Sequence, residues 1–182
     1  QELGSPSPAS NTIQFTDEYP EYVFDVIPFY WQDELHVFYL NGVFNEDLVR
    51  TGIKWSHVKT KDMVHWLKLP DAVLPGQGEN PPDPYIWTGS VIEKDGTFYL
   101  FYTGKSIPGK EDPKGDQKAM LATSTDLIHF EKKKDFVLYA DGEYYWNKNI
   151  NGPLDPSLKI HNQRDESFRD PEVFWNEEAG EY

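Results

Sequence analysis

Two aspartates, Asp25 and Asp170, occupy equivalent places near the start of a repeated unit, and Gly89-Ser90 holds that place in the copy between them. If the units form a ring, their first strands line one central channel, so residues at this place converge on a single pocket. Two facing carboxylates suit glycoside hydrolysis, in which one group attacks the anomeric carbon or orients water toward it and one protonates the leaving oxygen. The spacing therefore favours a sugar-cleaving site that contains Asp25 and Asp170.

The repeat has a period of about 64 residues, which is the spacing of stacked or radial arrays. Residues 57–66 (HVKTKDMVHW) return as 121–130 (LATSTDLIHF), and residues 29–39 (FYWQDELHVFY) align with 92–102 (IEKDGTFYLFY). Each pair combines apolar strands with polar turns. Strands throughout a repeating unit are typical of propeller blades.

Short runs of β-branched and aromatic residues, broken by polar turns, predict four strands in each of the first two units. The first unit has two strands within residues 22–44, separated by Gln32-Asp33-Glu34, and two more at 54–60 and 64–69. The second unit has strands at 87–93, 97–104, 117–124 and 127–132. Residues 71–84 and 105–116 read as loops because they are rich in Pro and Gly. No window shows sustained helical spacing, so we expect an all-β fold.

The expected organisation follows from these elements. It comprises a flexible leader at 1–18, blade one at 22–70, blade two at 85–132, an insertion at 133–168 and the start of blade three at 169–182. Because a propeller closes with roughly four to eight blades, about two and a half blades predict an N-terminal part of a larger domain. The alternative is a complete three-unit protein of another topology.

Composition excludes several classes of partner and site. The net charge of −14 disfavours nucleic acid and anionic membranes as partners, and no stretch approaches the roughly 20 apolar residues of a membrane span. The absence of cysteine excludes disulfides, thiolate metal sites and thiol nucleophiles. We expect no cofactor and no metal, although the acidic loops at 111–112 and 155–166 leave an oxygen-rich Ca²⁺ site as an alternative to a solvated surface. The polar leader lacks the basic and apolar regions of a signal peptide and could be the segment left after a secretory signal is removed, so we expect a secreted or periplasmic protein.

Five motifs, in order, resemble those of the β-fructosidases of glycoside hydrolase family 32. They are Trp55-Ser56-His57, residues 60–66 (TKDMVHW), residues 69–75 (LPDAVLP), residues 87–91 (WTGSV) and Phe168-Arg169-Asp170-Pro171. The resemblance covers residues 19–182 and implies the N-terminal part of a five-bladed propeller. It also implies an oligo- or polysaccharide substrate and the remainder of the same propeller as partner.

The resemblance also implies roles for individual residues. Asp25 would be the nucleophile that forms a covalent glycosyl-enzyme intermediate, and Asp170 the stabiliser of the transition state, neutralised and oriented by Arg169. Trp87 and Ser90 would shape the sugar subsite. The substrate-binding set also contains Trp55 and His57, with a buried core role as the alternative for His57. The acid/base of the family is a Glu in a later blade, so no residue here is assigned to it.

The first motif departs from the family pattern. The family has Asn-Asp-Pro where this chain has Phe24-Asp25-Val26, so contacts near the nucleophile must differ. Two alternatives therefore stay open. One is an inverting glycosidase similar to the arabinanases and xylosidases of glycoside hydrolase family 43, and the other is a carbohydrate-binding propeller without catalysis.

The remaining aromatic and histidine residues divide by their place in the repeat. His65 and His129 recur with the unit, so we expect them to stabilise a turn. Trp31, Trp66 and Trp175 lie on repeat strands and are expected in the core, whereas Trp87, Tyr85 and Trp146 are candidates for stacking on sugar rings.

Overall fold

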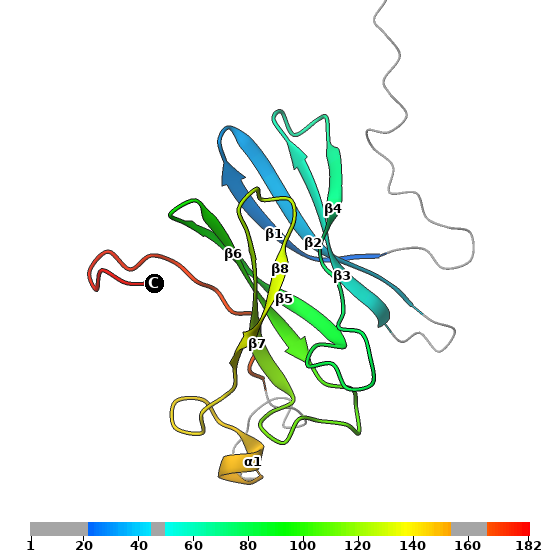
Figure 1. Cartoon of the computed structure of the whole chain (residues 1–182), viewed down its shortest axis with the longest axis vertical. Coiled ribbons are helices and arrows are strands. Elements are labelled where there is room, and N and C mark those ends of the chain that lie inside the picture. Colours follow the sequence, from blue (N-terminus) through cyan, green and yellow to red (C-terminus); the bar gives the residue numbers. More distant parts are fainter. Residues whose placement is uncertain (1–21, 45–49, 154–166) are drawn as a thin grey trace, which may run out of the picture. The chain divides into compact units, whose positions relative to one another are not determined.

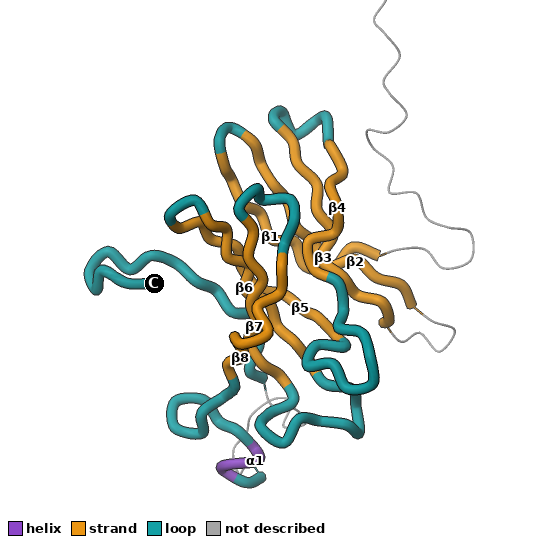
Figure 2. Tube along the Cα trace, in the orientation of Figure 1, coloured by secondary structure: helices purple, strands orange, loops and turns teal. Residues whose placement is uncertain are grey.

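The structure, a computed structural model, describes residues 22–44, 50–153 and 167–182 of the 182-residue chain. Its regular structure is almost entirely strand, with one short helical turn (Figures 1 and 2). The strands are β1 Tyr22–Trp31, β2 Glu34–Phe44, β3 Arg50–Thr60, β4 Leu67–Val73, β5 Tyr85–Lys94, β6 Thr97–Lys105, β7 Gln117–Ser124 and β8 Glu131–Leu138, and the helix is α1 Lys148–Asn151. The predicted all-β class is confirmed.

Each half of the chain holds one four-stranded antiparallel sheet. The first has the order β1-β2-β3-β4 and the second β5-β6-β7-β8. The chain divides between Leu74 and Pro75 into two compact units, one for each sheet. Sequential pairing of neighbouring strands is the up-and-down arrangement of a propeller blade.

The two sheets repeat down to the pairing of individual residues. The first hairpin turns at Trp31 opposite Glu34, and the second at Lys94 opposite Thr97. Each sheet then has a β-bulge at the same distance from its hairpin, between Val23 and Val26 in β1 and between Trp87 and Gly89 in β5. This register places Thr88, and not Gly89-Ser90 as the sequence alignment suggested, at the position that corresponds to Asp25.

The core of the first sheet is built from alternating residues of β2 and β3. Phe38 and Trp55 have no exposed surface, and their ring centroids lie 6.2 Å apart. In the second sheet the first six residues of β7, from Gln117 to Ala122, are all buried. Both faces of β7 are therefore covered, as in strands from the interior of layered sheets.

The motif shared by residues 60–66 and 124–130 forms the same turn in both sheets. The Thr60 hydroxyl accepts hydrogen bonds from the main-chain N–H groups of Asp62 and Met63, at 3.2 and 2.9 Å. One Asp62 carboxylate oxygen accepts from the N–H groups of Val64 and His65, and the other lies 2.6 Å from His65 Nδ1. Asp126 and His129 repeat these contacts, with Nδ1 to Oδ2 at 2.8 Å. The prediction that the two histidines stabilise a turn is confirmed.

The structure corrects four predicted boundaries of β4 and β8, and this turn explains two of them. Its main-chain N–H groups bond to the aspartate instead of a neighbouring strand, so β4 begins at Leu67 and not at residue 64, and β8 begins at Glu131 and not at residue 127. The same two strands continue to Val73 and Leu138, past the predicted starts of the loop at 71 and the insertion at 133.

Residues 170–175 form no regular strand, in contrast to the predicted start of a third unit. The predicted turn is present: Asn176 Oδ1 accepts from the N–H groups of Glu178 and Ala179, and Asn176 bridges to Glu181. Trp175 is 47% exposed and contacts Tyr182 edge-on, so its prediction as a core residue is wrong. Trp31 and Trp66 are half-buried.

Candidate active site

Asp25 lies in the β1 bulge, on the exposed surface of the first sheet. Phe24 and Asp25 together stand opposite the single residue Leu40, because the register moves from Val23–Asn41 to Val26–Tyr39. A bulge of this kind bends a strand locally and redirects one side chain out of the regular alternation. The fold thus gives Asp25 a solvent-accessible position at an irregularity that a plain strand would lack.

A polar network that the sequence did not reveal lies in the same sheet. The buried Ser56 hydroxyl donates to Asp71 Oδ1 at 2.8 Å and accepts from the Asn41 amide at 3.3 Å. Lys54 Nζ lies 2.9 Å from Asp71 Oδ2. Asp71 was missed because it was assigned to a loop, whereas it belongs to β4 beside the Trp55-Ser56-His57 motif.

Trp55 and His57, which the sequence predicted as substrate-binding residues, have no exposed surface, and this favours a packing role. His57 stacks on Phe38 with ring centroids 4.0 Å apart, and its Nε2 lies 2.9 Å from His36 Nδ1. Side chains without solvent-accessible area cannot contact a sugar directly. Their part in the motif is to pack the first sheet, which for His57 is the alternative that the sequence left open.

The surroundings of His57 fix its protonation. Burial, followed by the nearby His36, lowers the pKa of His57 to about 3, so the ring is neutral at ordinary pH. His57 Nδ1 is buried and has no hydrogen-bond partner among the described residues. An unpaired acceptor nitrogen is less costly to bury than an unpaired N–H, so we place the His57 proton on Nε2, where it is donated to His36.

In the second unit the predicted site residues Trp87, Arg169 and Asp170 lie together. The Arg169 guanidinium lies 5.8 Å from the centroid of Trp87, and Lys105 Nζ lies 5.1 Å from it. Arg169 Nε is 3.5 Å from Asp170 Oδ2. The side chains of Arg169 and Asp170 are 43% and 51% exposed, so both can reach a ligand. The prediction that Arg169 orients Asp170 agrees with this contact.

The main chain around Asp170 is held by two hydroxyl groups. Asp170 N–H donates to Thr103 Oγ1 at 2.8 Å, and Val173 N–H donates to Ser90 Oγ at 3.1 Å. Thr103 in turn donates to the carbonyl of Thr88, in the β5 bulge, at 3.0 Å. Ser90 was predicted to shape the sugar subsite, and here its hydroxyl fixes the segment that carries Asp170. Thr103 was not identified from the sequence.

A buried carboxylate supports the strands beneath this segment. Asp83 is 2% exposed, accepts from the Tyr102 hydroxyl at 2.8 Å and pairs with Lys132. Burial, followed by the charge of Asp83, raises the pKa of Tyr102 far above its usual range. Asp83 is buried and its Oδ2 contacts both Tyr102 and Lys132, which makes it a structural group and not a second candidate for catalysis.

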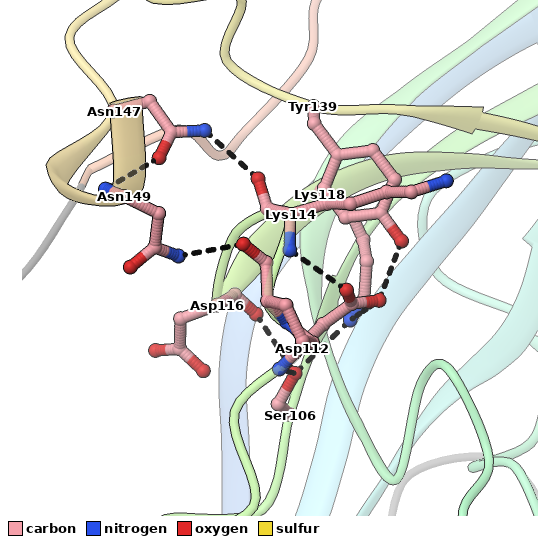
Figure 3. Close-up of polar contacts among 9 residues, drawn as sticks. Ser106, Asp112, Lys114, Asp116, Lys118, Tyr139, Asn147 and Asn149 are labelled. Carbon is pink, nitrogen blue, oxygen red and sulfur yellow. Dashed lines mark hydrogen bonds and ion pairs between the residues drawn. The ribbon is translucent and has the colours of Figure 1, made fainter. Parts of the chain in front are cut away.

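Asparagine side chains of the insertion form hydrogen bonds to the loop at residues 106–116, between β6 and β7 (Figure 3). The fully buried Asn147 amide donates to the carbonyls of Lys114 and Ala140, and its oxygen caps α1 by accepting from Asn149 N–H. Asn149 donates to the Pro113 carbonyl.

The acidic part of this loop is engaged in similar contacts. Asp112 accepts from the Tyr139 hydroxyl at 2.7 Å and lies 3.9 Å from the buried Lys118 Nζ. Within the described ranges no three His, Asp or Glu residues are grouped as metal ligands. The other acidic segment considered for Ca²⁺, 155–166, lies outside the described residues.

The described part of the chain also has no helix long and apolar enough to cross a membrane.

Comparison with known sequences identifies relatives of this arrangement. A family model described as the glycosyl hydrolases family 32 N-terminal domain matches residues 27–182. The chain is 35% identical over 116 residues to a sucrose-6-phosphate hydrolase of Escherichia coli, covering 62% of this chain and 23% of that protein. It is 33% identical over 156 residues to an insoluble β-fructofuranosidase isoenzyme of Arabidopsis thaliana, covering 85% and 25%. It thus spans about a quarter of the length of these relatives.

Solved structures share the fold. The β-fructofuranosidase of Schwanniomyces occidentalis superposes with a TM-score of 0.55 at 20% identity, over 98% of this chain and 32% of that one. The Bombyx mori family 32 β-fructofuranosidase gives 0.54 at 22% identity, over 85% and 28%. These likenesses confirm a partial β-propeller.

Proposed function

This chain belongs to glycosyl hydrolase family 32, and we propose that the full-length protein hydrolyses a β-fructofuranosidic bond with Asp25 and Asp170 as two of its catalytic residues. The observation that carries the proposal is the group formed by Trp87, Arg169 and Asp170. Its aspartate is solvent-accessible, contacts a cation and has its main chain held by the Thr103 hydroxyl. Such fixed geometry is what a group needs if it is to interact more strongly with the transition state than with the substrate.

In the proposed reaction a carboxylate oxygen of Asp25 attacks the anomeric carbon of the fructosyl unit. The bond from that carbon to the leaving oxygen breaks, and an acid from elsewhere in the full-length protein protonates the leaving oxygen. Asp170 accepts hydrogen bonds from sugar hydroxyls that strengthen as positive charge develops on the ring. Water then attacks the same carbon, its proton passes to the group that had acted as the acid, and the bond to Asp25 breaks to release the carboxylate.

The substrate class follows from the family and from the site. We propose an oligo- or polysaccharide that carries a β-fructofuranosyl unit, since the relatives above are named as a sucrose-6-phosphate hydrolase and a β-fructofuranosidase. Trp87 offers an aromatic surface beside the carboxylate, and Arg169 restricts the direction of Asp170. The match to family 32 favours this substrate over the arabinosides and xylosides that the sequence had left as an alternative.

Replacing Asp25 by Asn in the full-length protein tests the proposal. The change keeps the size of the side chain and removes the nucleophile, so release of fructose from sucrose or a fructan should fall on the order of 10³-fold or more. Asp33→Asn, at an exposed turn of the same hairpin, is the matched control and should retain the rate. Unchanged turnover in Asp25→Asn would exclude the nucleophile role. A wild-type protein that binds these sugars without cleaving them would be the non-catalytic propeller.

We also propose that the protein is secreted or periplasmic. The support is compositional: residues 1–10 (QELGSPSPAS) are small, polar and rich in Pro and Ser. These residues lie outside the described part of the structure. Fractionation of the producing cells checks the proposal, since protein confined to the cytoplasm would contradict it.

A further inference from the structure

We propose that Thr103 is a positioning residue for Asp170, setting the direction of its carboxylate through the main chain. This inference rests on the proposed function, because it needs Asp170 at the reacting sugar. Thr103 lies in β6 and has no exposed surface. Its hydroxyl accepts from Asp170 N–H at 2.8 Å and donates to the Thr88 carbonyl at 3.0 Å. One buried hydroxyl, as acceptor and as donor, therefore links Asp170 to the β5 bulge.

The conformation of Asp170 requires such support. Its φ of 57° lies in the left-handed region, which non-glycine residues rarely adopt. Pro171 follows, and a residue before proline normally takes an extended conformation. An unusual conformation persists only where neighbouring groups hold it, and Thr103 Oγ1 accepts a hydrogen bond from the main-chain N–H of Asp170.

The segment is fixed at a second point as well. Val173 N–H donates to Ser90 Oγ at 3.1 Å, on β5 beside the strand that carries Thr103. The two hydroxyls hold the chain on either side of Pro171-Glu172, which makes residues 170–173 a segment docked on the sheet. Ser90 acts three residues from Asp170, whereas Thr103 contacts Asp170 itself.

The first sheet shows that the hydroxyl is not needed for the bulge. The residue at the corresponding place in β2 is Leu40, which is buried and apolar, and the β1 bulge forms opposite it. A leucine and a threonine therefore serve equally well as partners of the two bulges. The second sheet differs in that Asp170 is docked on it. The Thr103 hydroxyl therefore holds the main chain of Asp170 and is not needed merely to pair β5 with β6.

The test compares Thr103→Val with Thr103→Ser in the full-length protein. Valine keeps the shape and removes the hydroxyl, so kcat for a β-fructofuranoside should fall about 10- to 100-fold while KM changes about threefold or less, because misplacement of a catalytic group costs rate at this scale. Serine keeps the hydroxyl and should restore kcat to within about threefold of wild type. Ser124→Ala, which removes a buried hydroxyl that bonds to Asp126 at the turn, is the control and should leave kcat unchanged.

The Asp170→Asn background separates positioning from general stability. If Thr103 acts through the Asp170 carboxylate, Thr103→Val should cause little further loss in this background. Equal losses in both backgrounds, or a wild-type kcat in Thr103→Val, would overturn the inference. If the valine variant does not fold, Thr103→Ala and Thr103→Ser replace the pair, and equal rates would overturn it likewise. Wild-type activity in Asp170→Asn alone would instead reject the proposed function.

Discussion

Nε2 of His57 and Nδ1 of His36 lie 2.9 Å apart inside the first sheet, so a single proton occupies the space between two buried rings. Protonating both rings would place two positive charges in contact away from water, which is strongly unfavourable. This pair couples the packing of the Trp55-Ser56-His57 motif to pH. The buried histidine pair therefore contributes to the stability of the first sheet.

The first prediction is a loss of stability in acid that depends on His57. Its pKa is about 3 in the fold and about 6.5 in an unfolded chain, so on acidification the unfolded state binds the proton first. The contribution of neutral His57 to the free energy of unfolding is fully present above a pH of about 6.5 and is lost as the pH drops toward 3. In His57→Gln, which has no such titration, the thermal midpoint should fall less between about pH 7 and pH 5 than in wild type.

His65→Gln is the control for this experiment, because His65 is exposed at a turn. It should keep the wild-type difference between the two pH values. The same pH dependence in wild type and in His57→Gln would show that the histidine pair does not carry the effect.

The second prediction concerns the close approach of β5 and β6 at Gly89. A Cβ at this position would lie 1.9 Å from the carbonyl oxygen of Phe101, which is main chain and cannot move aside. Gly89→Ala should destabilise the protein by about 3 kcal/mol or more, as overpacking does at its upper range. Gly96→Ala, which has a φ of 77° and open space around it, should cost only about 1 kcal/mol. Urea unfolding of both variants checks the order, and equal losses would contradict the steric account.

The third prediction concerns the link between the insertion and the loop before β7. Asn147→Ala removes two hydrogen bonds to main-chain carbonyls and the cap of α1, all from a fully buried side chain. Hydrogen exchange in residues 139–152 and 106–116 should accelerate, since buried carbonyls lose their partners. Asn149→Ala, which removes one exposed bond to Pro113, should have a much smaller effect. Unchanged exchange in Asn147→Ala would mean that other contacts hold this link.

The fourth prediction concerns Trp87 as the platform for Arg169. Trp87→Ala removes the ring that faces the guanidinium at 5.8 Å, so Arg169 and Asp170 should lose their relative orientation, and kcat/KM should fall on the order of 10-fold. Trp87→Phe keeps an aromatic face and should recover part of the loss. Trp175→Ala, an exposed tryptophan that contacts Tyr182, should leave kcat/KM near wild type. A full loss in Trp87→Phe would argue for indole-specific contacts instead.

The sequence predicted the strands because their signals are local. Alternating apolar residues and polar turns placed β2, β5, β6 and β7 to within a few residues, and the two copies of the repeat agreed with each other. It failed at Val64 and Leu127, where apolar side chains suggested strand but the aspartate of the turn takes the main-chain N–H groups. The competing hydrogen bonds of Asp62 and Asp126 outweigh the β-propensity of the residues that follow.

The amino-acid sequence by itself determined the repeat, the all-β class, the family and the candidate carboxylates Asp25 and Asp170, because these depend on residue types and their order. Only the tertiary structure decided that Trp55 and His57 are buried and that Asp170 is held by Thr103, 67 residues away in the sequence. Burial depends on which face of a pleated strand is covered, and a hydrogen bond depends on the path of the chain between its partners. Neither is a local property, so neither can be read from the motif in which a residue stands.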